Sequence, residues 1–140
     1  MKLSEHFSLG ELTKTKHVTP DGNIPSGVVV ENLKRLCPWL EELRLRCKAP
    51  IVINSGYRSP AVNKLAGGAK GSNHLTGCAV DIHTYGIEQA IRYAAILLDI
   101  ADGTKQEFDE LLLEQHGSVC WLHFVVKPQG NRRKIEFLKA

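Results

Sequence analysis

The sequence predicts an α+β fold in which helices pack on a mainly antiparallel sheet. Helical apolar spacing comes first along the chain, and two strand-like runs joined by a tight turn lie near the C-terminus. The chain has 140 residues, of which 43% are hydrophobic and 24% charged, as in soluble globular proteins. We therefore expect a single domain over residues 1–140, large enough for its own hydrophobic core.

The first 50 residues contain two predicted helices. Ser8 and Glu11 have the spacing of a capping box and indicate a short first helix. Residues 19–27 are rich in proline and glycine and read as a loop. Residues 28–47 then carry apolar side chains at helical spacing, although Pro38 is expected to kink or split this helix because it lacks an N–H donor.

The elements that follow are a strand, a helix, a strand and a helix, and then three strands. Residues 50–54 form a β-branched apolar run that predicts a buried strand, and Ser59 and Pro60 suit the first positions of a short helix ending near Gly67. The remaining predictions are a strand over 78–83, a helix over 87–100 ended by Asp102-Gly103, strands over 111–114 and 120–126 around a turn at 116–118, and a last strand over 134–138.

Charge and composition exclude several classes of function. The net charge is +3, and the basic residues are scattered along the chain with no aromatic residues alternating among them. We therefore expect no nucleic-acid partner. No signal peptide and no membrane-length apolar segment is visible, so we expect a cytoplasmic product without membrane insertion, and a monomer. The four cysteines form no CxxC pair and suit buried thiols in a reducing compartment; they are Cys37, Cys47, Cys78 and Cys120.

Three residues could form a catalytic metal site. His74 precedes a glycine-bearing turn, Asp81 lies in the strand after it, and His123 sits among apolar neighbours in a later strand. Imidazole and carboxylate groups are good zinc ligands, and a catalytic zinc takes three protein ligands. The spacing alone leaves plainer roles open: a surface histidine for His74, a backbone cap for Asp81, and a core histidine for His123.

A longer motif surrounds two of these residues. Residues 55–81 read S-G-Y-R-S-P-x-x-N-x-x-x-G-G-x-x-x-S-x-H-x-x-G-x-A-x-D, and W-x-H follows at 121–123. The series resembles the D-alanyl-D-alanine carboxypeptidase family of zinc peptidases, particularly its short single-domain phage-type members. The resemblance extends over nearly the whole chain and implies a hedgehog-like peptidase fold.

The resemblance also implies roles for individual residues. His74, Asp81 and His123 match the family's zinc ligands. Arg58 matches an arginine that faces the substrate and can bind a carboxylate or polarise the scissile carbonyl. Ser72 is expected either to contact substrate or to cap its own loop.

The general base departs from the family pattern. Several members carry an acid three residues before the last histidine, where this chain has Cys120. A hairpin turning near Gly117 would place Glu114 opposite Trp121 and on the same face as His123, so Glu114 is the predicted base. Weaker candidates are Asp109, Glu110 and His116.

Two functions follow as expectations. The first is a zinc peptidase that cuts peptidoglycan stem peptides next to D-amino acids at the bacterial cell wall, as a carboxypeptidase or as a lysin-type endopeptidase. The second is a catalytically inactive, zinc-containing cell-wall-binding module, which the lack of an acid at Cys120 would favour.

Overall fold

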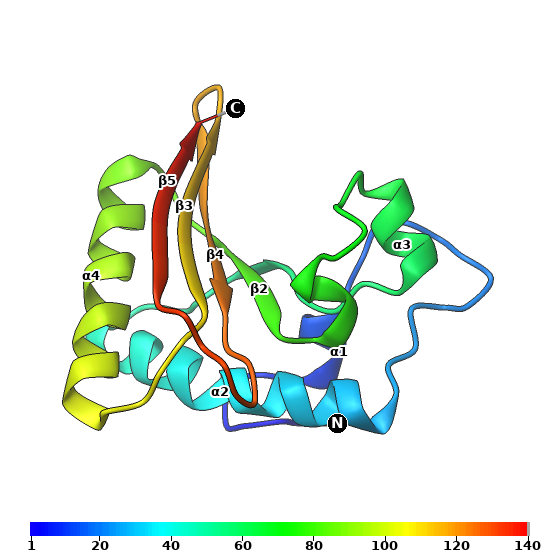
Figure 1. The fold of residues 1–140 in the computed structure, drawn as a ribbon, viewed down its shortest axis with the longest axis horizontal. Helices are drawn as coiled ribbons and strands as arrows, with labels where there is room; N and C mark the ends of the chain where they lie inside the picture. The colour runs from blue at the N-terminus through cyan, green and yellow to red at the C-terminus, as the bar shows by residue number, and fades with distance from the viewer. Residues whose placement is uncertain (140) are drawn as a thin grey trace.

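A five-stranded sheet forms the centre of the computed structural model, which describes residues 1–139 (Figure 1). In spatial order the strands are β1 (Ile53–Ser55), β2 (Ala79–His83), β4 (Val119–Val125), β3 (Glu110–His116) and β5 (Lys134–Lys139). Neighbouring strands are antiparallel except for β3 and β5, which run parallel. The predicted α+β class and the mainly antiparallel sheet are confirmed.

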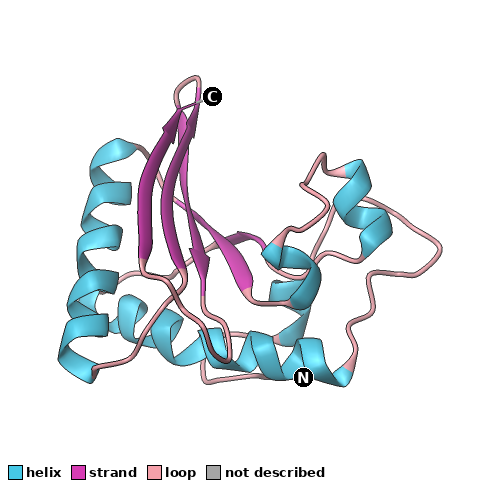
Figure 2. Ribbon diagram, in the orientation of Figure 1, coloured by secondary structure: helices cyan, strands magenta, loops and turns pink. Residues whose placement is uncertain are grey.

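The helices are distributed around this sheet. They are α1 (Leu9–Thr13), α2 (Gly27–Cys47), α3 (Pro60–Leu65), the 3-10 helix η1 (Asn73–Thr76) and α4 (Ile87–Thr104). Helix α4 lies on one side of the sheet and α3 on the other, with α2 crossing beneath (Figure 2). No helix over residues 1–139 combines the length and the hydropathy that crossing a bilayer requires.

The two faces of the sheet have different chemistry because side chains alternate along each strand. Leu111 of β3, Leu122 of β4 and Ile82 of β2 belong to the buried core that α2 and α4 complete. The intervening residues point to the opposite face, where Asp81 lies directly across from His123. The packing of one sheet face in the hydrophobic core therefore fixes the strands that carry the polar residues on the other face.

One helix prediction needs correction: α4 extends past Asp102 and Gly103 to Thr104. Of the two outcomes expected at Pro38, the split does not occur, because α2 continues through this residue. Pro38 removes only one backbone hydrogen bond, whereas its neighbours Cys37 and Trp39 are buried in the core and hold the helix together. The predicted strand over 50–54 is shifted, since β1 covers Ile53–Ser55.

A close approach between α1 and the end of β1 fixes the segment beside the polar face. The backbone N–H of Tyr57 donates to the carbonyl of Leu12 at 2.8 Å. A Cβ atom on Gly56 would lie 2.2 Å from that same carbonyl oxygen. Only glycine fits here without moving backbone.

Gly56→Ala is therefore expected to destabilise the protein by about 1–3 kcal/mol, the range found for overpacked sites. Urea unfolding measures the difference. Gly103→Ala is the matched control: nothing lies within 4 Å of its added Cβ and it sits in α4, so about 0.5–1 kcal/mol of stabilisation is expected. Equal stability of the two variants would contradict the close approach.

Candidate active site

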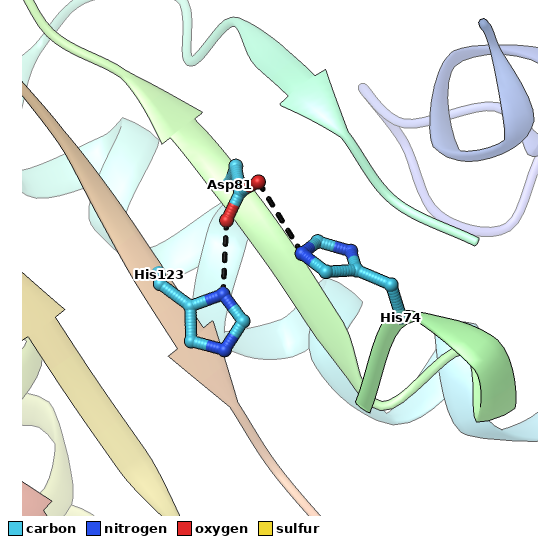
Figure 3. Close-up of side chains that lie close together, drawn as sticks. All are labelled: His74, Asp81 and His123. Atoms are coloured by element: carbon cyan, nitrogen blue, oxygen red, sulfur yellow. Dashed lines mark hydrogen bonds and ion pairs between the residues drawn. The ribbon is translucent and has the colours of Figure 1, made fainter. Parts of the chain in front are cut away.

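His74, Asp81 and His123 meet on the polar face of the sheet, each from a different element (Figure 3). His74 Nε2 lies 3.3 Å from Asp81 Oδ2, and His123 Nδ1 lies 2.9 Å from Asp81 Oδ1. The side chains of His74 and Asp81 are buried, and that of His123 is 14% exposed. The three residues predicted as metal ligands are thus brought together.

Local structure fixes the ring of His74. The Ser72 hydroxyl caps η1 by accepting from the His74 backbone N–H, and Asn32 of α2 donates to the Thr76 carbonyl. His74 Nδ1 lies 2.7 Å from the Gly56 carbonyl oxygen, which can only accept, so Nδ1 carries the proton. Nε2 is therefore the ring nitrogen that faces Asp81 and that could ligate a metal after losing its proton.

His123 is held from the opposite side by an acid. Its Nε2 lies 3.4 Å from Glu110 Oε1, which leaves Nδ1 directed at Asp81. Glu110 in turn accepts from Asn73 at 3.3 Å and from Arg132 at 3.0 Å. Such outer carboxylates fix the orientation of histidine ligands in metal sites. Glu110 was only a weaker candidate for the base in the sequence, and its contact with His123 was not predicted.

Electrostatics keep Asp81 charged. Burial disfavours the ionised carboxylate, but hydrogen bonds from His123 and His74 outweigh it and hold the pKa of Asp81 well below its usual range. For His123, burial lowers the pKa, yet the bond to Asp81, followed by the charges of Asp81, Glu114 and Glu110, raises it above the ordinary 6.5. The metal-free site thus pairs a carboxylate with a readily protonated histidine.

The donor set fits a zinc ion. Two ligands at tetrahedral zinc are separated by about 3.3 Å, given zinc–ligand bonds of about 2.0–2.1 Å. Each imidazole faces a different oxygen of Asp81, at 3.3 Å for His74 and 2.9 Å for His123. One donor atom from each of the three residues lies within 4.8 Å of the other two, which is the arrangement that a metal ion requires.

A zinc site that uses His123 as a ligand is expected to lose affinity as the pH is lowered, because the metal must displace the proton of His123. Below the raised pKa of His123, each decrease of one pH unit should weaken zinc binding about tenfold. Above that pKa, where the imidazole is already neutral, His123 should add no pH dependence. Competition with a chromophoric chelator at several pH values measures this, and an affinity independent of pH from mildly acidic to neutral solution would contradict the assignment.

A cleft of about 480 Å³ lies over the three residues. Its wall includes Glu114 and Trp121, which are direct cross-strand partners in the β3–β4 hairpin. The Trp121 indole N–H donates to Glu114 Oε2 at 2.7 Å. The predicted hairpin register is therefore confirmed, and Glu114 shares the face of His123. Cys120 points to the other face and is buried in the core.

The other predicted polar residues divide into two groups. Arg58 lines the cleft, where its Nη2 lies 3.4 Å from Asp81 Oδ2, and Ser72 lines it as well. Asp109 is instead wholly buried and bound by Arg132, and His116 lies exposed at the end of the hairpin strand. Neither Asp109 nor His116 borders the cleft.

A His-Asp-His group with a further carboxylate in the same cleft is an arrangement that suits a metal-dependent hydrolase. The family described as Peptidase M15 matches residues 5–110, well over half of the chain, so the chain belongs to this peptidase family. The matched segment contains Arg58, His74 and Asp81 and ends before Glu114 and His123. No curated protein matches the sequence.

Proposed function

We propose that the protein is a zinc metallopeptidase that hydrolyses peptidoglycan stem peptides next to D-amino acids. His74, Asp81 and His123 are its zinc ligands and Glu114 its general base. The observation that carries the proposal is the presence of Glu114 on the same sheet face as the His-Asp-His group, in a chain of the peptidase M15 family. Glu114 and Trp121 line the same cleft as the proposed zinc ligands.

The residues divide the work of hydrolysis. A zinc ion held by His74, Asp81 and His123 would supply Lewis acidity toward the scissile carbonyl and the attacking water. Glu114 accepts the proton of the attacking water and delivers it to the leaving amine. The Trp121 N–H bond at 2.7 Å holds one carboxylate oxygen of Glu114 and leaves the other for the proton.

Arg58 and Ser72 are proposed to contact the substrate. The Arg58 guanidinium is partly buried, with Nε donating to Ser55 at 3.0 Å and Nη2 facing Asp81. Its remaining N–H groups can donate to a carbonyl or carboxylate of the peptide. The Ser72 hydroxyl caps η1, and it can also donate its own hydrogen to a substrate carbonyl.

The inactive binding module is the alternative function. Its main support was the absence of an acid at Cys120, but that side chain faces the core while Glu114 occupies the cleft. A carboxylate next to the proposed zinc ligands favours turnover over binding alone.

Defined stem peptides test the proposed function and identify the bond. Purified protein is incubated with a stem pentapeptide ending in D-Ala-D-Ala and with a cross-linked stem dimer, and the products are identified by mass spectrometry. Loss of one terminal alanine indicates a carboxypeptidase, and an internal cut indicates an endopeptidase; either should stop when a chelator is added. A protein that holds zinc and cuts neither substrate would refute the peptidase and favour the binding module.

A further inference from the structure

We propose that a second hollow next to the metal cleft binds a carboxylate group of the peptide substrate; this inference rests on the proposed peptidase function. The hollow has a volume of about 300 Å³. The loop that follows α1, strand β1 and helix α3 surround it, and this loop passes α3 on its way to α2 (Figure 1). No residue of the hollow belongs to the proposed metal site.

The hollow is basic on two sides. Lys14, Lys16 and His17 line it from the loop, and Arg58 lines it from the end of β1. None of the described residues that line it is acidic. Within residues 1–139, Lys14, Lys16 and His17 take part in no ion pair. An anion entering the hollow would therefore meet Lys14 and Lys16 without having to displace a carboxylate, although Arg58 also faces Asp81.

Arg58 joins the hollow to the metal cleft. Arg58 and Ala66 line both cavities. On the hollow's side the Arg58 Nε donates to Ser55, and on the other side its Nη2 approaches Asp81. A peptide that crosses Arg58 can thus place its scissile bond beside the zinc ligands while a carboxylate of the same peptide lies between Arg58 and Lys14.

The distribution of acids indicates where a carboxylate of the peptide would lie. Asp81, Glu110 and Glu114 line the cleft, whereas none of the described residues that line the hollow is acidic. A single carboxylate near the scissile bond is therefore better accommodated in the hollow than beside the cleft acids. In a stem peptide that carboxylate can be the C-terminal one or the free carboxylate of the glutamate residue.

Peptide binding to the zinc-loaded Glu114→Gln protein tests the inference, because binding can be measured there without cleavage. Isothermal titration calorimetry compares a stem pentapeptide with its C-terminal amide and with its glutamate amide. Each peptide is titrated into Glu114→Gln alone, into Glu114→Gln with Lys14→Gln and Lys16→Gln, and into Glu114→Gln with Lys34→Gln and Lys64→Gln. The last pair is the control, since it removes the same charge from exposed lysines outside the hollow.

Loss of Lys14 and Lys16 should weaken binding of the free acid about tenfold, as two solvent-accessible ion pairs allow, while the control pair changes it less than about twofold. Amidation of the carboxylate that the hollow holds should weaken binding to Glu114→Gln at least as much as loss of the two lysines does, because the amide also loses its ion pair with Arg58. The variant without Lys14 and Lys16 should bind that amide no more weakly than Glu114→Gln alone does. That amide identifies the carboxylate that the hollow holds.

The carboxylate subsite would be overturned if the Lys14/Lys16 variant and the Lys34/Lys64 variant bound the free-acid peptide equally well, or if no peptide bound at all. If the wild-type protein nevertheless cleaves stem peptides, the proposed function stands without the subsite. If the wild-type protein cleaves no stem peptide, but the preference for the free acid over one amide still depends on Lys14 and Lys16, the subsite stands and the peptidase function fails. The two ideas can therefore fail separately.

Discussion

Replacement of Glu114 by glutamine is expected to lower kcat by about 10²–10⁴-fold, the usual contribution of a general base. The amide oxygen of glutamine can still accept the hydrogen bond that Trp121 donates to Glu114 at 2.7 Å, so the hairpin should be undisturbed. What is lost is a group able to take the proton. Steady-state kinetics on a stem peptide, with zinc content measured on the same sample, separates loss of the base from loss of the metal.

Glu110→Gln provides the comparison for this variant. Glu110 also borders the cleft, but its carboxylate is occupied by Arg132 and Asn73 and faces the outer nitrogen of His123. Its replacement should leave most of the turnover. If Glu110→Gln abolished turnover while Glu114→Gln preserved it, the base would be Glu110 and the proposed assignment would be wrong.

Replacement of Asp81 by asparagine is expected to cause the largest loss of zinc affinity. Removing an outer partner of a ligand typically costs about 10–100-fold in affinity, and loss of an anionic ligand should exceed this. Asp81 is also the group that both histidines and Arg58 face, so its charge organises the whole cluster. Competition titration with a chelator measures the affinity, and thermal unfolding of the metal-free variant checks that it folds.

The same titration on Glu110→Gln calibrates the result for Asp81. Glu110 touches His123 from the side away from Asp81, and we therefore expect a loss within the range for outer partners. If Asp81→Asn bound zinc as well as Glu110→Gln does, Asp81 would not be a ligand. The metal would then have to be held by a different set of residues.

Local sequence signals predicted most of the elements and the register that places Glu114 in the cleft. Strand alternation and the position of Gly117 predicted that Glu114 lies opposite Trp121, and the structure pairs these residues. The capping signals at Ser8 and Ser59 likewise mark the starts of α1 and α3. These predictions succeeded because each depends on a short stretch of chain with a strong local preference.

Features that depend on distant segments were missed. Helix α2 continues through Pro38 because core packing compensates for one lost hydrogen bond, which local propensity does not reveal. The role of Glu110 depends on β3 starting one residue before the predicted strand, and on Asn73 and Arg132 reaching it from elsewhere in the chain. The basic hollow likewise requires the loop at Lys14 to lie against α3 and Arg58.

Zinc-dependent cleavage tests the central claim most directly. Protein stripped with a chelator is titrated with zinc while the product from its stem peptide is measured at each addition. We predict that the rate rises in proportion to zinc and reaches a plateau at one ion per chain, because one His-Asp-His group is present within residues 1–139. Cleavage that persists in the stripped protein, or a fully zinc-loaded protein that releases no product from any stem peptide, would contradict the account.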